Sequence, residues 1–500
     1  MVAGHSRDLM RKPVEIRLDL PGPLAESPGV QRRQYARFVH DPIGFFSAIY
    51  ENYGPLSAMV CDGTPMVFAV GPELNRQILG DPEAFHSFGL TVPGPAGSSQ
   101  WRMGYGIFRQ DTQTNSRRRK IFSPMLSRHA VQSHLPQMVE VIDEMLDGWR
   151  VGDTVEITNQ MRDLSLSAAC RVLFGLNPEG RWRDIGRPIE RWMRMNSSIG
   201  GRLSTPGRPR AGFRRMLEGA GDLESHVKEL VAACDGRGNL LSALVRAHGR
   251  ERENLDWDEL LGQTAVLLAA AYETTAMALT WTLFLLAQHP SVASEVWEEI
   301  EDNIAGEAPT AAELNRLELV DRVIKESLRL LPPAVYGTRV AITPTELGGH
   351  LLPKGANVFF SHYLTQRMPE IYSQPRKFLP GRWEKIHPSP FAYMPFGAGP
   401  RKCIGATYSK FVIKLAIAMI FKRYRLTVAP ETTINRSVKI ILFPRRGIPM
   451  IVSRQDGRFQ RAAVGGNINE MVDMYSSSRG RGAVRVTLPA SVGRGLPSIV

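Results

Sequence analysis

The chain has 500 residues, and 43% of them are hydrophobic, so it can bury a sizeable core and is not a disordered polymer. A mean hydropathy of −0.18 excludes a protein with many membrane spans. Lys and Arg number 62 against 49 Asp and Glu, which leaves a net charge of +13. This excess serves solubility or favours an acidic partner or an anionic cofactor. No nucleic-acid partner is expected, because no zinc-finger, RNA-binding or basic heptad pattern occurs.

The four cysteines are too few for a disulfide scaffold, and Cys61, Cys170, Cys234 and Cys403 form no CxxC pair. Neither a zinc site nor a dithiol redox site is therefore expected. Widely spaced single cysteines fit a reducing compartment. The N-terminal segment contains no apolar run of seven or more residues, so we expect no signal peptide or anchor and a cytoplasmic protein.

Helical periodicity dominates, with short strand-like runs between the helices, so we expect one large, mainly α domain with small β-sheets. Residues 1–30 are expected to form an irregular lead-in, residues 31–453 the domain, and the Arg-, Gly- and Ser-rich residues 454–500 a disordered tail. In chain order, the expected helices are Ile43–Tyr53, Val131–Arg150, Leu223–Ala233, Trp257–Gln288, Val292–Ile304, Ala311–Leu331 and Thr407–Tyr424; the expected strands are Met66–Val70, Asn357–Phe360 and Leu426–Ala429.

The apolar stretch Thr264–Gln288 is long enough to cross a bilayer. Glu273 stands in its middle, and a carboxylate there costs about 2.5–3.5 kcal/mol on insertion scales. A helix that is apolar all round also forms the centre of large soluble proteins. We therefore expect no membrane span and a buried central helix.

The segment Phe396–Gly405 places a single cysteine between glycine-bearing turns, directly before a helical pattern. Glycines let the backbone approach a flat ligand without a Cβ clash. A cysteine at a helix N-terminus is expected to have a lowered thiol pKa, and thiolate is the form that ligates iron. Arg401 and Lys402 supply cations suited to a cofactor that carries carboxylates.

Two further segments carry polar groups in apolar surroundings. Glu326 and Arg329 lie three residues apart on one predicted helix face, where they can pair, before a Pro-Pro terminator. Glu273 and Thr274 stand inside the long apolar helix. Buried polar groups need partners, and an acid next to a hydroxyl can form a proton path into a dry pocket.

The spacing Phe-x-x-Gly-x-Arg-x-Cys-x-Gly resembles the haem-binding signature of the cytochrome P450 family, the haem-thiolate monooxygenases. The resemblance covers about residues 40–453 and implies the family fold, with haem b held by Cys403 as axial ligand between Phe396 and Gly405. It also implies that Glu326 and Arg329 form a structural cluster with Arg382.

The resemblance implies roles for further residues. Thr274 would stabilise dioxygen at the iron, and Glu273 would help deliver protons. The haem propionates would be held by Arg119, Asn115, Arg339 and Arg401, where Asn115 replaces the family's usual His or aromatic residue. The substrate pocket would be lined by Leu268, Ala269, Ala270, Val335, Tyr336, Ile441 and Leu442.

These residues imply insertion of one oxygen atom from O2 into a small apolar substrate, such as a terpenoid, a fatty acid or a polyketide-like molecule. Because no reductase domain follows residue 453, electrons are expected from a separate ferredoxin and ferredoxin reductase, with Arg117–Lys120 as a basic docking face. A monomer is expected. A peroxide-dependent peroxygenase, a non-catalytic haem sensor and a membrane-anchored family member are the alternatives.

Overall fold

The structure is a computed structural model, and some stretches of the chain lie outside the part that it describes. It describes residues 19–23, 27–87, 91–176, 181–196, 211–234, 236, 238–250, 255–439 and 441–474. Most of the expected lead-in, residues 1–18 and 24–26, therefore lies outside the described residues. The first helix, α1, begins at Pro28, before the expected boundary at residue 30.

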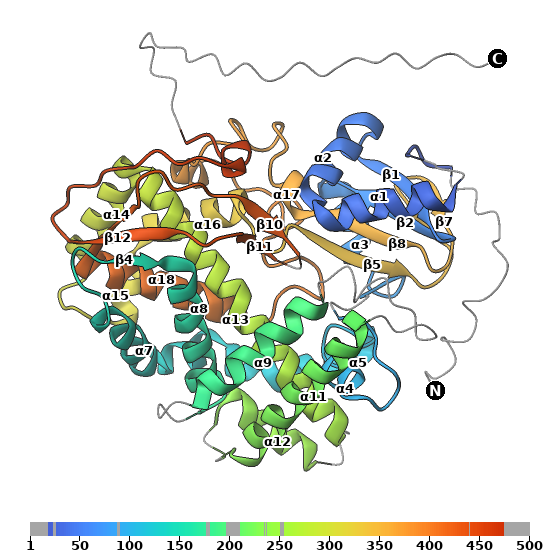
Figure 1. Cartoon of the computed structure of the whole chain (residues 1–500), viewed down its shortest axis with the longest axis horizontal. Coiled ribbons are helices and arrows are strands. Elements are labelled where there is room, and N and C mark those ends of the chain that lie inside the picture. Colours follow the sequence, from blue (N-terminus) through green and yellow to red (C-terminus); the bar gives the residue numbers. More distant parts are fainter. Residues whose placement is uncertain are drawn as a thin grey trace, which may run out of the picture.

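Helices make up most of the described chain, as expected, and Figure 1 shows them as one large body beside a smaller sheet. They are α1 (Pro28–His40), α2 (Pro42–Tyr53), α3 (Pro72–Gly80), α4 (Ser99–Met103), α5 (Thr112–Phe122), α6 (Arg128–Ser133), α7 (Leu135–Asp147), α8 (Ile157–Ala168), α9 (Arg181–Asn196), α11 (Ala211–Ala232), α12 (Leu240–His248), α13 (Trp257–Gln288), α14 (Pro290–Asn303), α15 (Ala311–Arg316), α16 (Glu318–Leu330), α17 (His362–Thr365) and α18 (Ala406–Arg423).

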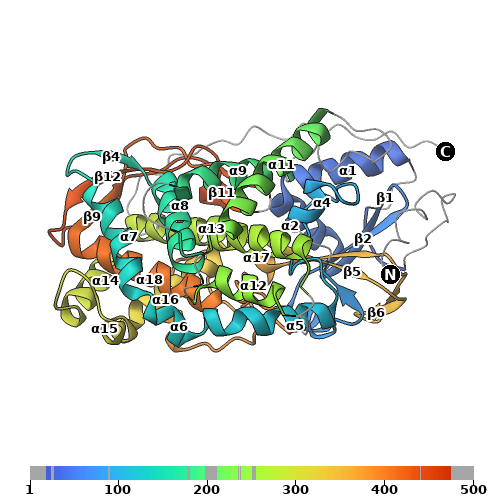
Figure 2. The ribbon, with the colours of Figure 1, turned by 90° about the horizontal axis from the view of Figure 1, so that it is seen from below.

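The long helix α13 runs through the middle of the helical body (Figure 2). The Asp256 carboxylate caps its N-terminus by accepting a hydrogen bond from the backbone N–H of Glu259. The helix is long and apolar enough to cross a membrane, but 83% of its most hydrophobic window is buried inside the protein. It is therefore the core helix that the sequence predicts.

The strands form a mixed five-stranded sheet and three smaller antiparallel sheets. The large sheet has the order β1-β2-β8-β5-β3, and only the β2–β8 pair is parallel. The register of β5 against β8 pairs Arg339 with Val358. The strands are β1 (Leu56–Cys61), β2 (Thr64–Ala69), β3 (Phe85–His86), β4 (Thr154–Glu156), β5 (Tyr336–Ala341), β6 (Thr345–Leu347), β7 (His350–Leu352), β8 (Asn357–Ser361), β9 (Tyr424–Val428), β10 (Arg436–Val438), β11 (Leu442–Pro444) and β12 (Pro449–Arg454).

Two expected helices are each interrupted in the structure. The range 131–150 divides between α6 and α7 at His134, because Pro136 in the first turn of α7 cannot donate a backbone hydrogen bond. The range 311–331 divides at Leu317, where the backbone leaves the helical region. The Glu299 carboxylate then accepts hydrogen bonds from the first backbone N–H groups of α16. Periodicity alone does not show these breaks.

The expectation of a disordered tail from residue 454 is wrong for residues 454–474. The ring of Phe459 stacks on Phe421 with centroids 5.7 Å apart, and Arg367 donates to the carbonyl oxygen of Met471. Residues 475–500 lie outside the described residues. Five side chains of this stretch are at most 5% exposed and belong to the main core: Val464, Ile468, Met471, Val472 and Met474.

Candidate active site

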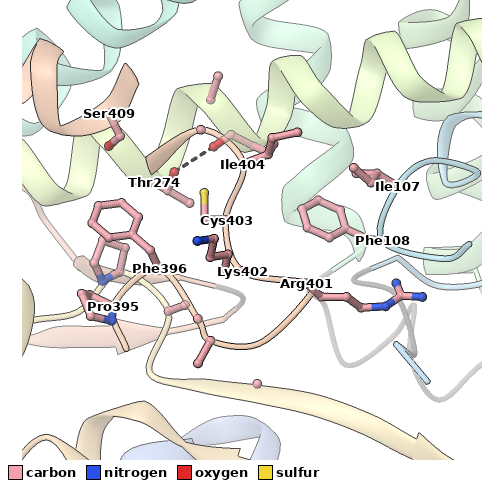
Figure 3. Close-up of a pocket in the computed structure, with 18 of the residues that line it drawn as sticks. Ile107, Phe108, Thr274, Pro395, Phe396, Arg401, Lys402, Cys403, Ile404 and Ser409 are labelled. Atoms are coloured by element: carbon pink, nitrogen blue, oxygen red, sulfur yellow. Dashed lines mark hydrogen bonds between the residues drawn. The ribbon is translucent and has the colours of Figure 1, made fainter. Parts of the chain in front are cut away.

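The cysteine loop lies directly before α18 and turns its sulfur toward a cavity (Figure 3). The backbone N–H of Cys403 donates to the Phe396 carbonyl oxygen over 2.7 Å, which closes the loop. Gly399 has a φ of +70°, and a Cβ there would lie 2.1 Å from the carbonyl oxygen of Leu79. Only glycine allows this close approach, so the loop geometry explains the glycine in the motif.

The thiol pKa of Cys403 corrects one expectation from the sequence. Burial raises it above the ordinary value of 9.0, and the backbone N–H of Gly405 and the charge of Arg119 only partly oppose this rise. The Cys403 side chain is exposed to the cavity that it lines. Burial therefore outweighs the helix N-terminus, on which the expectation of a lowered pKa rested.

The cavity beside Cys403 has an empty volume of about 1740 Å³, including its open mouth. No carboxylate lines it within the part of the chain that the structure describes. Its apolar wall includes Ile107, Phe108, Leu267, Ala270, Ala271 and Phe396.

Three arginines line this cavity, as the sequence predicts for the propionates. Arg119 donates to the carbonyl oxygen of Lys402 over 2.9 Å, and Arg401 donates to that of Gln110 over 2.5 Å. Burial, with the nearby positive charge of Arg401, lowers the pKa of Arg339 to about 10. The buried Nε of Arg401 has no hydrogen-bond partner. These three arginines and Lys402, with no acid among the described lining residues, fit a cofactor that carries carboxylates.

Asn115 lines the cavity, but its amide group is already engaged. Its Nδ2 donates to the carbonyl oxygen of Ile107 over 2.7 Å. Thr274 also lines the cavity, and its hydroxyl donates to the Ala270 carbonyl oxygen over 2.8 Å. Figure 3 shows Thr274 on the same side of the cavity as Ser409.

Glu273 does not share the cavity with Thr274. Its carboxylate pairs with Arg162 on α8 at 2.8 Å and borders a second pocket, which Arg162 and Arg445 also line. Adjacent residues of a helix point about 100° apart, so the expected acid and alcohol face different pockets. Glu273 Oε2 is buried without a hydrogen-bond partner.

Only two of the seven expected pocket residues, Ala270 and Tyr336, line the cavity. Leu268, Ala269, Val335 and Leu442 are buried in packing, and Ile441 borders the second pocket. The α13 residues that do line the cavity share one helix face with Thr274. A spacing of three or four residues from Thr274 could have identified most of them from the sequence. The lining residues missed by sequence reasoning include Leu267, Ala278, Phe360 and His362.

The structural cluster around Glu326 is fully assembled, and we call it the Glu326 cluster. Arg329 forms two hydrogen bonds of 2.9 Å to the carboxylate, and Arg382 adds a third of 2.9 Å. Trp383 and the backbone N–H of Leu379 also donate to Glu326, each over 3.0 Å. Glu326 and Arg329 are 0% exposed. The charge is therefore compensated on both carboxylate oxygens, as a buried ion needs.

The comparisons with known proteins identify the family of this chain. Residues 31–199 and 223–451 match the family model described as Cytochrome P450. The chain therefore belongs to the cytochrome P450 family, which confirms the resemblance and the expected fold. It is a P450 monooxygenase, and family membership implies a haem-thiolate cofactor, a bound substrate and O2.

Bacterial enzymes are among the relatives in sequence. Cyclooctat-9-en-7-ol 5-monooxygenase of Streptomyces melanosporofaciens is 29% identical over 412 residues, 79% of this chain and 87% of that protein. Pentalenene oxygenase of Streptomyces avermitilis is 27% identical, and the match covers 83% of this chain and 94% of that protein. Among solved structures, the cytochrome P450DA heme domain superposes with a TM-score of 0.74 at 21% identity, with 89% and 98% covered. The structure described as retinoic acid bound cyanobacterial CYP120A1 superposes with a TM-score of 0.71 at 23% identity, and the match covers 83% of this chain and 95% of that chain.

Proposed function

We propose that this P450 monooxygenase hydroxylates or otherwise oxygenates an apolar terpenoid-sized molecule in the cavity beside Cys403. The supporting observation is that one apolar cavity holds a cysteine sulfur, a threonine hydroxyl and three arginines, with no carboxylate among its described lining residues. Two relatives are named for oxidising cyclooctat-9-en-7-ol and pentalenene. Fatty acids and polyketide-like molecules are the competing substrate classes.

In this proposal, Cys403 ligates the haem iron, and Arg119, Arg339 and Arg401 hold the propionates. When bound, haem supplies the iron centre at which O2 is activated. Phe396 and Gly405 shape the loop beside the sulfur. The apolar wall excludes water and presents the substrate. The haem domain in this proposal extends from about residue 31 to residue 474, beyond the boundary that the sequence favours.

Thr274 and Glu273 would act at the two ends of a proton path across α13. The Thr274 hydroxyl would act inside the cavity. Glu273 would take up protons from water in the second pocket, where its Oε2 is unpartnered. Thr274→Ala should uncouple oxygen use from product formation, and Glu273→Gln should slow turnover with coupling retained. Unchanged coupling in Thr274→Ala would remove this role and favour a peroxide-dependent reaction.

Electrons would come from a ferredoxin and its reductase. Arg117, Lys120, Lys402 and Lys410 are exposed around the cysteine loop and form a basic face for an acidic protein. Arg118 does not contribute to this face, because it is buried. Turnover should need added ferredoxin and should fall as salt rises. Turnover with NAD(P)H alone would contradict the proposal.

We also propose a cytoplasmic monomer. Cell fractionation and the molar mass in solution measure these two properties directly. Recovery in the membrane fraction would overturn the proposed location, and the mass of a dimer would overturn the proposed monomeric state.

The central experiment is the carbon monoxide difference spectrum of the dithionite-reduced holoprotein. A strongly red-shifted Soret band that is lost in Cys403→Ala would establish the thiolate ligand. Absence of haem, or a band typical of histidine ligation, would overturn the proposed function. Titration of the wild type with apolar ligands would then identify the substrate class by shifts of the iron spin state.

A further inference from the structure

A buried polar cluster lies where α5, the N-terminal half of α13 and the segment Gly106–Gln110 meet. Arg118 and Glu259 form its centre through two short bonds, Nε to Oε1 at 2.5 Å and Nη2 to Oε2 at 2.6 Å. Both residues are at most 4% exposed. We call this group, with Gln110 and Gln263, the Glu259 cluster.

The cluster grips the segment Gly106–Gln110 from several sides. Gln110 donates to Glu259 Oε1 over 2.5 Å, and Gln263 donates to the same oxygen over 3.3 Å. The Gln263 Oε1 atom in turn accepts the backbone N–H of Ile107 over 3.0 Å. Both the side chain at the end of the segment and the backbone at its second residue are thereby fixed to α13.

Two further contacts join this segment to the cofactor side of the cavity. Asn115 donates to the carbonyl oxygen of Ile107, and Arg401 donates to that of Gln110. The backbone of the neighbouring turn also lies directly against α13, since a Cβ on Gly262 would be 2.1 Å from the carbonyl oxygen of Tyr105. The segment is therefore held by backbone contact as well as by side chains.

The held segment carries Ile107 and Phe108, which form part of the apolar cavity wall. In Figure 3 they lie across Cys403 from Phe396 and Pro395. Phe108 is one of the large apolar side chains that stay exposed, at 36%. Packing therefore covers this side chain only in part, and the position of the backbone on either side also decides where the ring lies.

We infer that the Glu259 cluster positions Ile107 and Phe108 against the substrate and so determines which apolar substrates fit and how they are oriented. Glu259 and Gln263 are positioning residues, because they act through the segment and line no part of the cavity themselves. The charged pair gives the contact its rigidity, since bidentate Arg–carboxylate bonds restrict direction as well as distance. This inference rests on the proposed function, because it assumes that the substrate occupies the cavity beside Cys403.

Two azole ligands test the inference without the unknown substrate. Imidazole binds haem iron through nitrogen, and 4-phenylimidazole adds an apolar ring that must fit against the cavity wall. The measurement is the dissociation constant of each azole for the holoprotein, from the Soret shift, in wild type and Gln263→Met. This substitution removes the acceptor for Ile107 and leaves the Arg118–Glu259 pair in place.

Gln263→Met also removes the longer hydrogen bond from Gln263 to Glu259. It should weaken 4-phenylimidazole binding by roughly threefold to tenfold, the size of effect expected from losing the one hydrogen bond that holds Ile107, and should leave imidazole binding unchanged. Thr264→Val is the matched control, since Thr264 is equally buried but donates only to Leu260 within its own helix. Thr264→Val should leave both constants unchanged. Glu259→Gln is the second variant and should show the same selective loss.

An unchanged ratio of the two constants in Gln263→Met would overturn the inference, provided that the carbon monoxide band is intact. An equal loss for both azoles would also overturn it, because this result indicates a general effect on the haem site. If the wild type lacks the thiolate band, the proposed function itself fails. The two failures are thereby distinguishable.

Discussion

The Glu326 cluster and the Glu259 cluster are chemically alike but differ in how the chain builds them. Each places one carboxylate against arginine in the interior. Glu326 binds one arginine three residues away and a second one 56 residues away, whereas Glu259 binds an arginine 141 residues away. The first cluster is buried and paired in the core, and the second, by our inference, holds the wall that faces the substrate. Similar local chemistry thus serves stability in one place and substrate positioning in the other.

Removal of the Glu326 charge should have the largest effect. Glu326→Gln leaves Arg329 and Arg382 buried without a counter-ion, so the free energy of unfolding should fall by about 3–5 kcal/mol. Urea unfolding and the yield of holoprotein measure this. Asp62→Asn is the control, since it breaks an ion pair with Arg32 in which both side chains are at least half exposed, and it should cost less than about 1 kcal/mol. Equal effects of the two substitutions would contradict the comparison.

The corresponding substitution in the Glu259 cluster should lower the free energy of unfolding by a smaller amount. Glu259→Gln loses one arginine pair and keeps an acceptor oxygen, so we expect a loss of about 1.5–3 kcal/mol. The carbon monoxide band should stay intact, whereas substrate or azole selectivity should change. Loss of the haem band in Glu259→Gln but not in Glu326→Gln would reverse the roles that we assign.

The segment 454–474 should stabilise the part of the fold around the Glu326 cluster. It contacts residues close to that cluster, through Arg367 with Met471 and through Arg376 with Asp473. Truncation after Arg454 should lower the free energy of unfolding by about 1–2 kcal/mol, because lost apolar burial is largely offset by released chain entropy. Truncation after Met474 is the control, since it keeps all of these contacts. Identical melting temperatures for both would show that the packed segment is dispensable.

The smallest expected effect is a pH dependence of the stability that Glu224 on α11 contributes. Burial alone would raise the pKa of Glu224 on α11, but hydrogen bonds from Arg102 on α4, Lys228 and Ser99 outweigh it and lower the pKa to about 2. The Glu224 carboxylate takes up a proton near pH 4.5 in the unfolded chain, but only near pH 2 in the folded chain. The stabilisation is therefore complete above pH 4.5 and is lost as the pH falls toward 2. The stability difference between wild type and Glu224→Gln should narrow between pH 5.5 and 3.5 in urea unfolding. A constant difference would contradict this assignment.

Residues close together in the sequence were the easiest to predict. The cysteine loop, the Glu326–Arg329 pair and the helix Trp257–Gln288 follow from local spacing, because a helix turn or a glycine turn fixes neighbours within a few residues. The roles of site residues remain proposals even where their positions agree with the expectation.

Residues whose partner is distant in the chain were predicted least well. Arg118 looks like part of an exposed basic run, yet it is buried against Glu259. Glu273 looks like a partner of Thr274, yet it pairs with Arg162 on another helix. The side chain of a helical residue points in a direction set by the helix, but what it meets there depends on how the helices pack.

The sequence by itself determined the family, the cysteine ligand candidate, the mainly helical fold and the buried central helix. These depend on local geometry and on periodic burial, which short spacings in the chain encode. Only the tertiary structure decided which face of α13 borders the cavity, where Glu273 and Arg118 find their partners, and that residues 454–474 join the core. These outcomes depend on contacts between segments more than a hundred residues apart or on the docking of an irregular segment, and no local pattern in one sequence specifies them.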